Sequence, residues 1–404
     1  MEQGQLIVAC DFGTTAFRVL VVNVSHEGMR VVGAGSAESV GFRDGDFVDL
    51  TSASRALERA VTAAESAADV DISGFFFSVS GSHLRSVWAR CQQQIGPERR
   101  PITPQDVDLV IDKAHGMGIP FDHAILVANP VGFTVDGIAG VVDPVGRAGS
   151  HLEADVHIVT GSSTVLQNIE SAIGKLNREA VGWCVDVLAS SAVLLDDAAK
   201  DAGAALVDIG GSVTQWALFH NGEIAGCGQV PWGGEHLTAD LAHGLRVSMP
   251  EAEAVKRSRG VVLRSLTDAI DPDVLFEEDA PAESPGLIAT VLEPRLEEIL
   301  ALVKKDMAQA LGLGDLRGGL VITGGGSRCA GTDDLAEQVF QLPVTLRYLP
   351  ANIAGTDRLP PGQWGTALGL AAWAVGDSGH DEDPRHSGGG GGLKGILKKI
   401  WPRR

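Results

Sequence analysis

Two glycine-containing turns, each placed between apolar strands, constrain the fold of this chain more than any other feature. The segment LIVACDFGTTAFRVLVVNV (6–24) predicts a strand, a DFGTT turn and a second strand. ALVDIGGSVTQWALFHNGEI (205–224) repeats that arrangement, and its His220-Asn221-Gly222 sequence predicts the next hairpin turn. A third segment, GLVITGGGSRCAGTDDLAEQVF (319–340), predicts a strand, a triple-glycine turn and a helix that begins near Thr332. This order of elements indicates an α/β protein.

The residue types in these turns are suited to binding a nucleotide. Small residues let backbone N–H groups come close to a phosphate. Asp11 in the first hairpin and Asp208 in the second follow a strand, where a carboxylate can hold a hydrated Mg²⁺ ion. One such strand end is more often ordinary turn chemistry, but two, followed by a third glycine turn, indicate a phosphate-binding site. The residues alone therefore predict a two-lobed nucleotide-binding α/β protein.

The charge of the chain is distributed unevenly. Its formal net charge is −20, yet the segment GGGGGLKGILKKIWPRR (388–404) holds five basic residues and no acidic one. The remainder carries 27 of the 32 basic residues and all 52 acidic residues, which gives it a charge of −25. A body this acidic is not expected to bind nucleic acid.

The cysteines and the apolar runs favour a cytoplasmic protein. The first residues, MEQGQLIVACDFG, lack the features of a signal peptide, and no apolar run reaches the ~20 residues of a membrane-spanning helix. The five cysteines stand far apart without metal-ligand spacing, so buried thiols are expected instead of disulfides. They are Cys10, Cys91, Cys184, Cys227 and Cys329.

Six stretches match the motifs of one protein family. They are FSVSGSHLRS (77–86), ITPQDVDLVIDKA (102–114), HLEADVHIVTGSSTVLQN (151–168), ALVDIGG (205–211), VPWGGEHLTADLAHGL (230–245) and TGGGSRCAGTDDLAEQVFQLPV (323–344). With them, the chain resembles the FtsA family of bacterial cell-division proteins, within the actin-like ATPase superfamily. The resemblance spans about residues 5–375 and then the C-terminal tail. The region between 80 and 158 makes it specific, because it looks like the small insert subdomain of FtsA.

The resemblance implies an α/β, actin-like (ribonuclease-H-like) two-lobed ATPase fold with an FtsA-type insert subdomain and a C-terminal amphipathic helix. A weakly ordered acidic loop, DPDVLFEEDAPAESPG (271–286), is expected in the second lobe. The first lobe is expected to comprise residues 1–79 and 159–190 with a returning helix at 362–375, and the insert residues 80–158. The second lobe is expected at 191–229 and 301–361, with an extra subdomain at 230–300. A flexible linker at 376–392 and the amphipathic helix at 393–404 would follow.

In this family the first hairpin wraps the β- and γ-phosphates of ATP. The position after Thr15, usually lysine in FtsA-like proteins, is Ala16 here. Arg18 lies two residues further along, on the same face of the strand, and is the candidate substitute. The positions that match the phosphate-1 motif are Asp11, Gly13, Thr14 and Thr15.

The second hairpin departs further from the family pattern DIGGGTTD, since it reads DIGGSVTQ (208–215). Ser212 at a glycine position is expected to crowd the phosphate or to need strained dihedrals. Gln215 can hold a water but can serve neither as an anionic metal ligand nor as a base. The cofactor-binding positions that match this motif are Gly210, Gly211, Ser212 and Thr214. The candidate catalytic residues are Asp11, Asp208 and Asp186, and Asp186 lies in a helix expected over WCVDVLASSAVLL (183–195). Asp11 and Asp208 are also the candidate Mg²⁺ ligands, which would hold the ion through water.

The adenosine side follows the family pattern more closely. Glu253, Lys256 and Arg257 lie at i, i+3 and i+4 and so share one helix face, which in this superfamily contacts the ribose and base. An exposed, salt-bridged helix is the alternative interpretation. Gly324, Gly325 and Gly326 match the adenosine turn, and Gly233 and Gly234, followed by Thr238 and Asp240, match a segment that closes the cleft.

Two functions compete for this site. One is an ATPase whose turnover drives a conformational cycle, and the other is a nucleotide-stabilised scaffold with slow or absent chemistry. Hydrolysis needs water oriented in line with metal-neutralised phosphates, and the chain departs from the pattern at Ala16, Ser212, Val213 and Gln215. We therefore predict Mg²⁺-ATP binding with weak hydrolysis.

The C-terminal tail has the pattern of a short amphipathic helix. Its apolar residues fall at i, i+3, i+4, i+7 and i+8 from Leu393, and Pro402 ends the segment. A helix of ~12–15 Å cannot span a bilayer, so it is expected to lie in the interface of an anionic membrane. Packing on the protein's own body or on a partner is the alternative, but the linker DSGHDEDPRHSGGGGG (377–392) has a flexible composition. The membrane-binding candidates are Leu393, Lys394, Ile396, Leu397, Lys398, Lys399, Ile400, Trp401, Arg403 and Arg404.

The resemblance also implies partners and a location. FtsA-like proteins polymerise through the insert subdomain and link FtsZ filaments, through the FtsZ C-terminal peptide, to the cytoplasmic face of the cell membrane at the septum. Polymerisation would strengthen a weak membrane anchor, because each added subunit binds at a high effective concentration. The alternatives are a related actin-like adaptor such as the cytoplasmic pilus-assembly protein, an active actin-like ATPase with a different partner, and a chaperone-type ATPase.

Overall fold

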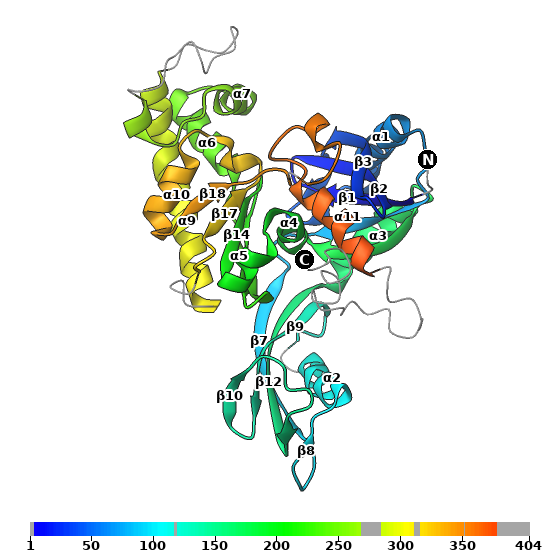
Figure 1. Cartoon of the computed structure of the whole chain (residues 1–404). Coiled ribbons are helices and arrows are strands. Elements are labelled where there is room, and N and C mark those ends of the chain that lie inside the picture. Colours follow the sequence, from blue (N-terminus) through cyan, green and yellow to red (C-terminus); the bar gives the residue numbers. More distant parts are fainter. Residues whose placement is uncertain (1–3, 117–118, 268–283, 311–315, 351, 378–404) are drawn as a thin grey trace.

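The chain folds into two α/β lobes and an insert. A computed structural model describes residues 4–116, 119–267, 284–310, 316–350 and 352–377. The amphipathic tail, nearly all of its linker and most of the expected acidic loop lie outside these ranges. Figure 1 shows the two lobes beside one another and the insert projecting away from both.

Each lobe is built on a five-stranded sheet, and the two sheets share one topology. In the first the order is β3-β2-β1-β6-β13, and in the second it is β16-β15-β14-β17-β18. In both, the first three strands form antiparallel hairpins and the last two run parallel to the first. The strands of the first sheet are β1 (Gln5–Phe12), β2 (Ala16–Ser25), β3 (Gly28–Glu38), β6 (Gly74–Val79) and β13 (Glu179–Val185); those of the second are β14 (Ala204–Ile209), β15 (Thr214–His220), β16 (Glu223–Val230), β17 (Leu320–Thr323) and β18 (Val344–Leu346).

Helices cover these sheets, and sequence signals mark where several of them begin. Asp49 caps the first helix by accepting hydrogen bonds from the N–H groups of Thr51 and Ser52. The helices of the first lobe are α1 (Leu50–Ala68), α3 (Ser163–Gly174), α4 (Asp186–Leu194) and α11 (Gly365–Asp377). The helices of the second lobe are α5 (Asp197–Ala202), α6 (Gly234–Leu245), α7 (Met249–Arg259), α9 (Pro285–Ala310) and α10 (Thr332–Phe340). The short elements are β4 (Phe42–Arg43), β5 (Asp46–Phe47), η2 (Arg264–Leu266), η4 (Gly325–Arg328) and η5 (Thr356–Arg358).

The insert has its own sheet, in the order β10-β9-β12-β7, and its own buried apolar cluster. The helix expected from Thr103 is confirmed, because Thr103 and Asp106 form a capping box at its start. Asp106 also pairs with Arg100 at 2.7 Å, which lowers its pKa. The elements are β7 (Arg85–Gln94), β8 (Arg100–Pro101), α2 (Pro104–Asp112), η1 (Lys113–Gly116), β9 (His123–Val135), β10 (Ile138–Val141), β11 (Ala148–Gly149) and β12 (His151–Ser162).

Two expected helices have different bounds in the structure. The helix expected over 183–195 is wrong for its first residues, because these complete β13, and α4 begins only at Asp186. Residues of β13 pair in parallel with β6, and this pairing outweighs the helical pattern of the sequence. The returning helix begins at Gly365 instead of Gly362, whose φ of +79° belongs to a turn. As expected, α11 packs back on the first lobe, against α4 and β1.

The cysteine prediction is confirmed. All five cysteines are buried and none forms a disulfide.

None of the helices in the described ranges has both the length and the apolar composition needed to span a bilayer.

The insert also contacts the second lobe, along β16 at the edge of that lobe's sheet. The Asn129 side chain of β9 donates to the carbonyl of Ile224 at 3.1 Å. The Trp88 indole of β7 donates to the carbonyl of Ala225 at 3.4 Å, and the Ser86 hydroxyl donates to the carbonyl of Cys227. These side chains occupy backbone acceptors that an edge strand otherwise leaves to solvent. The insert is therefore joined covalently to the first lobe and by hydrogen bonds to the second.

A buried histidine at this junction predicts an acid-sensitive stability. His157 of β12 is fully buried, and burial lowers its pKa to about 4. The unfolded chain takes up the proton near 6.5 while the folded chain does not, so stability is lost as the pH falls from 6.5 to about 4. We expect His157→Gln to flatten this pH dependence by on the order of 2–3 kcal/mol, as measured by urea unfolding at several pH values. An equal acid dependence in both proteins would contradict it.

Candidate nucleotide-binding site

The first hairpin turn is held above an aromatic cluster. Asp11 lies opposite Arg18 and Phe12 opposite Phe17, so Gly13, Thr14 and Thr15 form the turn between β1 and β2. Both phenylalanines are buried, and their rings meet edge to face at 5.5 Å. This packing fixes the base of the turn and presents its glycine and two threonines away from the core.

The second hairpin turn repeats this geometry. Asp208 lies opposite Gln215 and Ile209 opposite Thr214, and the Gly210 N–H closes the turn on the carbonyl of Val213 at 3.0 Å. The Thr214 hydroxyl donates to the carbonyl of Trp232 at 2.7 Å. This bond joins the turn to the segment that precedes α6.

The two turns meet. The hydroxyls of Thr14 and Ser212 share a hydrogen bond of 2.8 Å between the lobes. A Cβ atom on Gly211 would lie 2.9 Å from Cγ2 of Thr15. Ser212 is not among the described residues with a positive φ, so the strain expected of it is absent. Its hydroxyl instead bridges the two lobes.

The third glycine turn lies directly against the second. Gly324 has a φ of +92°, and a Cβ atom there would lie 2.3 Å from Oδ1 of Asp208 and 2.4 Å from the carbonyl oxygen of Ile209. At Gly326 a Cβ would lie 2.5 Å from the Ile209 side chain. Only glycine allows this approach.

The start of α6 joins the same group of turns. The N–H of Gly234 donates to the carbonyl of Gly210 at 2.8 Å, and the N–H of Glu235 donates to the carbonyl of Gly211 at 2.8 Å. The structure thus brings the predicted positions Gly210, Gly211, Gly233, Gly234, Gly324 and Gly326 into one cluster.

The predicted adenosine residues extend from this cluster on α7. Nζ of Lys256 donates to the carbonyl of Gly234 at 2.8 Å and to the Thr238 hydroxyl at 2.7 Å. Glu253 pairs with Lys256 and Arg257, each at 2.7 Å. Burial raises the pKa of Glu253, but the hydrogen bonds from Lys256, Thr238 and Arg257 outweigh burial, so the pKa is lowered overall. Lys256 is therefore fixed beside the glycines.

Two residues of these segments lie away from the cluster. The side chain of Arg257 is 65% exposed, and its described ion pair is with Oε1 of Glu253. Asp240 pairs with Arg295 of α9 at 2.5 Å, so its carboxylate is used to hold α6 on α9.

The middle glycine of the third turn borders open space, because a Cβ on Gly325 would meet nothing within 4 Å.

The charge of Asp11 acts on the other two predicted acids. Asp11 and Asp186 are buried and Asp208 is half-buried, and Asp11 raises the pKa of each of the other two carboxyls. Burial raises the pKa of Asp11, although Arg18 opposes the shift. Burial and the charge of Asp11 raise the pKa of Asp186 well above its usual range, and raise that of Asp208 to about 7. These raised pKa values mean that the carboxyls hold protons more readily than usual, and a bound cation would favour their charged forms.

The sequence did not reveal every contact of these acids. Ser78, at the end of β6, accepts from the Phe12 N–H at 2.9 Å and donates to Oδ1 of Asp11 at 3.3 Å. The signal that could have found it is the parallel pairing of β6 with β1, which places the end of β6 beside Asp11. The second contact that the sequence did not reveal is the ion pair of Arg18 with Asp11, in which Nη1 lies 3.2 Å from Oδ2.

The donor set fits ATP and Mg²⁺. Converging glycines and a buried lysine suit a phosphate chain and its sugar. Oδ1 of Asp186 is buried without a hydrogen-bond partner in the described structure, and carboxylate oxygens are the ligands that Mg²⁺ prefers. Within the described ranges no three acidic, histidine or cysteine side chains are grouped to hold a metal alone. These residues therefore fit a metal held mainly through water and phosphate.

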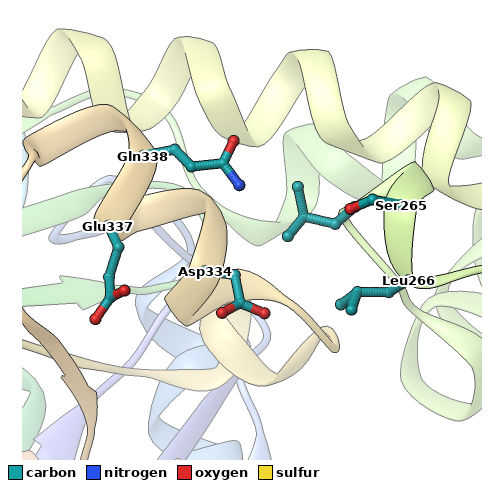
Figure 2. A pocket seen from close by; sticks show the side chains of 6 residues that line it. Ser265, Leu266, Asp334, Glu337 and Gln338 are labelled. Atoms are coloured by element: carbon teal, nitrogen blue, oxygen red, sulfur yellow. The ribbon is translucent and has the colours of Figure 1, made fainter. Parts of the chain in front are cut away.

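A concave region lies between η2 and α10 (Figure 2). It has a volume of about 370 Å³ and is lined by Leu263, Ser265, Leu266, Asp334, Glu337 and Gln338. None of the predicted site residues lines it. Its carboxylates, Asp334 and Glu337, would repel phosphates, so it is not a second candidate for the nucleotide.

Family models and known sequences match most of the chain. The model described as "SHS2 domain inserted in FTSA" matches residues 81–160, and "Cell division protein FtsA" matches residues 205–356. Cell division protein FtsA of Pseudomonas aeruginosa is 32% identical over 381 residues, which is 93% of this chain and 90% of the relative. FtsA of Neisseria meningitidis is 31% identical over 412 residues, 99% of both chains. FtsA of Bacillus subtilis is 30% identical over 93% of this chain and 84% of its own.

Solved structures show the same fold at low sequence identity. A PilM–PilN type IV pilus biogenesis complex is similar with a TM-score of 0.62 and 13% identity, covering 90% of this chain and 97% of that one. MreB 5 of Spiroplasma citri bound to AMPPNP is similar with a TM-score of 0.53 and 14% identity, covering 90% and 94%. At this identity the likeness establishes the actin-like two-lobed fold and nothing finer.

Proposed function

Because this chain belongs to the FtsA family of cell division proteins, we propose that it binds ATP between its lobes, polymerises, and tethers FtsZ filaments to the cytoplasmic membrane at the septum. The observation that carries the nucleotide part is the meeting of the three predicted glycine turns in one cluster. The similarity over nearly the whole length supports the cell-division part.

Each group of residues has a part in holding the nucleotide. The turns at 13–15 and 210–212 would enclose the phosphates with backbone N–H groups and the hydroxyls of Thr14 and Ser212. Lys256, held beside Gly234, would contact the ribose side, and Gly325 leaves space next to it. Mg²⁺, when bound, neutralises phosphate charge, and Asp11 and Asp208 would hold it through water.

We expect slow hydrolysis. Gln215 lies opposite Asp208, where a carboxylate could act as base, and an amide cannot accept the proton of an attacking water. Asp186 is the carboxylate that remains for orienting water. A steady-state phosphate-release assay should give turnover near background with Mg²⁺, and Gln215→Asp should raise it. Fast turnover by the wild type would favour the alternative of an active actin-like ATPase.

The tethering role is tested by recruiting FtsZ to vesicles. FtsZ should sediment with anionic liposomes only when this protein and ATP are both present. FtsZ without its C-terminal peptide is the matched control and should stay in the supernatant. Sedimentation that does not depend on the peptide, or none at all, would refute FtsZ tethering and favour an adaptor with another partner.

A further inference from the structure

The residues opposite the two hairpin aspartates set the charge of the phosphate site. Asp11 lies opposite Arg18 on β2, and Asp208 lies opposite Gln215 on β15. The two hairpins occupy the same place in two sheets of identical topology, so these are equivalent positions. One holds a cation and the other a neutral amide. Neither hairpin adds a second acid to the site.

Arg18 is built into the first turn. Its side chain is 11% exposed, and Nη1 lies 3.2 Å from Oδ2 of Asp11 and 3.4 Å from the carbonyl oxygen of Ala16. A Cβ atom on Gly13 would lie 3.0 Å from the same Nη1. The guanidinium therefore lies directly beneath the residues that would face the phosphates, with the backbone of Gly13 against it.

The remaining donors of Arg18 suit an anion. A guanidinium carries five N–H donors, and both of these contacts use Nη1. Its desolvation is already offset by the Asp11 carboxylate, so binding an anion would not require burying a new charge. Guanidinium groups bind phosphate through paired N–H donors, which a point charge cannot do.

The other charged groups around the turns leave room for this role. Asp186 is a further buried acid and Asp208 a half-buried one, and Glu235 comes within 3.4 Å of the Cβ position of Gly211. Lys256 lies beside Gly234 of the glycine cluster. The ammonium of Lys256 is already engaged by Glu253, the Gly234 carbonyl and the Thr238 hydroxyl, so Arg18 is the cation that would face a triphosphate placed between the turns.

We propose that Arg18 is the resident cation of the phosphate site and that, together with the neutral Gln215, it makes ATP binding by this chain largely independent of Mg²⁺. This inference rests on the proposed nucleotide binding and deepens it. Mg²⁺ neutralises the charge of the phosphates, and the Arg18 guanidinium offers positive charge and paired N–H donors to the same groups, while Gln215 keeps the position opposite Asp208 neutral.

The test is the affinity for a fluorescent ATP analogue, measured by anisotropy with Mg²⁺ and with EDTA. Wild type should bind in both, with dissociation constants within about tenfold of each other. Arg18→Gln should weaken binding in EDTA by about 10–100-fold, since a hydrogen bond to a charged group is lost, and by less with Mg²⁺. Gln215→Asp should widen the difference between the two conditions by restoring an acid.

A second variant separates this role from folding. Arg18→Gln leaves the Asp11 carboxylate buried without its ion pair, so its thermal stability is expected to fall. The double variant Asp11→Asn with Arg18→Gln removes both charges and should recover stability while binding in EDTA stays weak. Recovered binding would overturn the inference, as would wild-type binding that disappears in EDTA. Binding absent in both conditions would instead overturn the proposed function itself.

Discussion

Replacing Gly324 by alanine should lower the affinity for ATP by about 100-fold and the free energy of unfolding by on the order of 2–4 kcal/mol. The alanine Cβ would lie 2.3 Å from Oδ1 of Asp208 and 2.4 Å from the carbonyl of Ile209, at a φ of +92°. These atoms belong to the strand end that supports the second phosphate turn. They must move, and the turn moves with them.

The neighbouring glycine is the matched control. A Cβ on Gly325 would meet nothing within 4 Å, so Gly325→Ala should leave the free energy of unfolding within about 0.5 kcal/mol of the wild type. Urea unfolding and anisotropy with a fluorescent ATP analogue measure the two effects. If Gly324→Ala bound the analogue as well as wild type, the third turn would have no part in the site.

Deleting residues 393–404 should release the protein from anionic vesicles completely. The deleted segment holds five cations, and each contributes about 1 kcal/mol at an anionic surface, which together corresponds to a loss of over about 1000-fold. The apolar stripe predicted from the sequence would add the burial of Trp401 and its neighbours in the interface. Co-sedimentation with vesicles of increasing anionic lipid content measures this.

Two point variants show which part of the segment carries the binding. Trp401→Glu should release most of the protein, because it places a charge on the apolar stripe, and Trp401→Phe should retain binding. Undiminished sedimentation of the deletion variant would show that another surface contacts the membrane. Sedimentation of Trp401→Glu at the wild-type level would show that the segment does not insert its apolar face.

Local signals were enough to predict the hairpins, the turns and several helix starts. Thr103 followed by Pro104 marked the start of α2, and Asn221-Gly222 marked the turn between β15 and β16, where both residues have positive φ. Such signals depend only on residues that are close in the sequence, so a single amino-acid sequence is enough to recognise them. The resemblance to FtsA added the pairing of the lobes, which no local pattern contains.

Contacts between distant residues could not be predicted in the same way. The Thr14–Ser212 hydrogen bond joins residues 198 positions apart, and Ser212 was expected to be a defect in its turn. The strand that ends at Val185 looked helical, because its pairing with β6 is invisible in the local pattern. The Arg18–Asp11 pair could have been predicted, because the register of the hairpin places these two residues opposite each other.

A crystal structure with a non-hydrolysable ATP analogue tests the account most directly. We expect the triphosphate between the turns at 13–15 and 210–212, the base beside Gly325 and Lys256, and the 2.8 Å contact between Thr14 and Ser212 replaced by contacts to phosphate. An analogue bound elsewhere, or a Thr14–Ser212 bond that persists with the nucleotide present at saturating concentration, would contradict it.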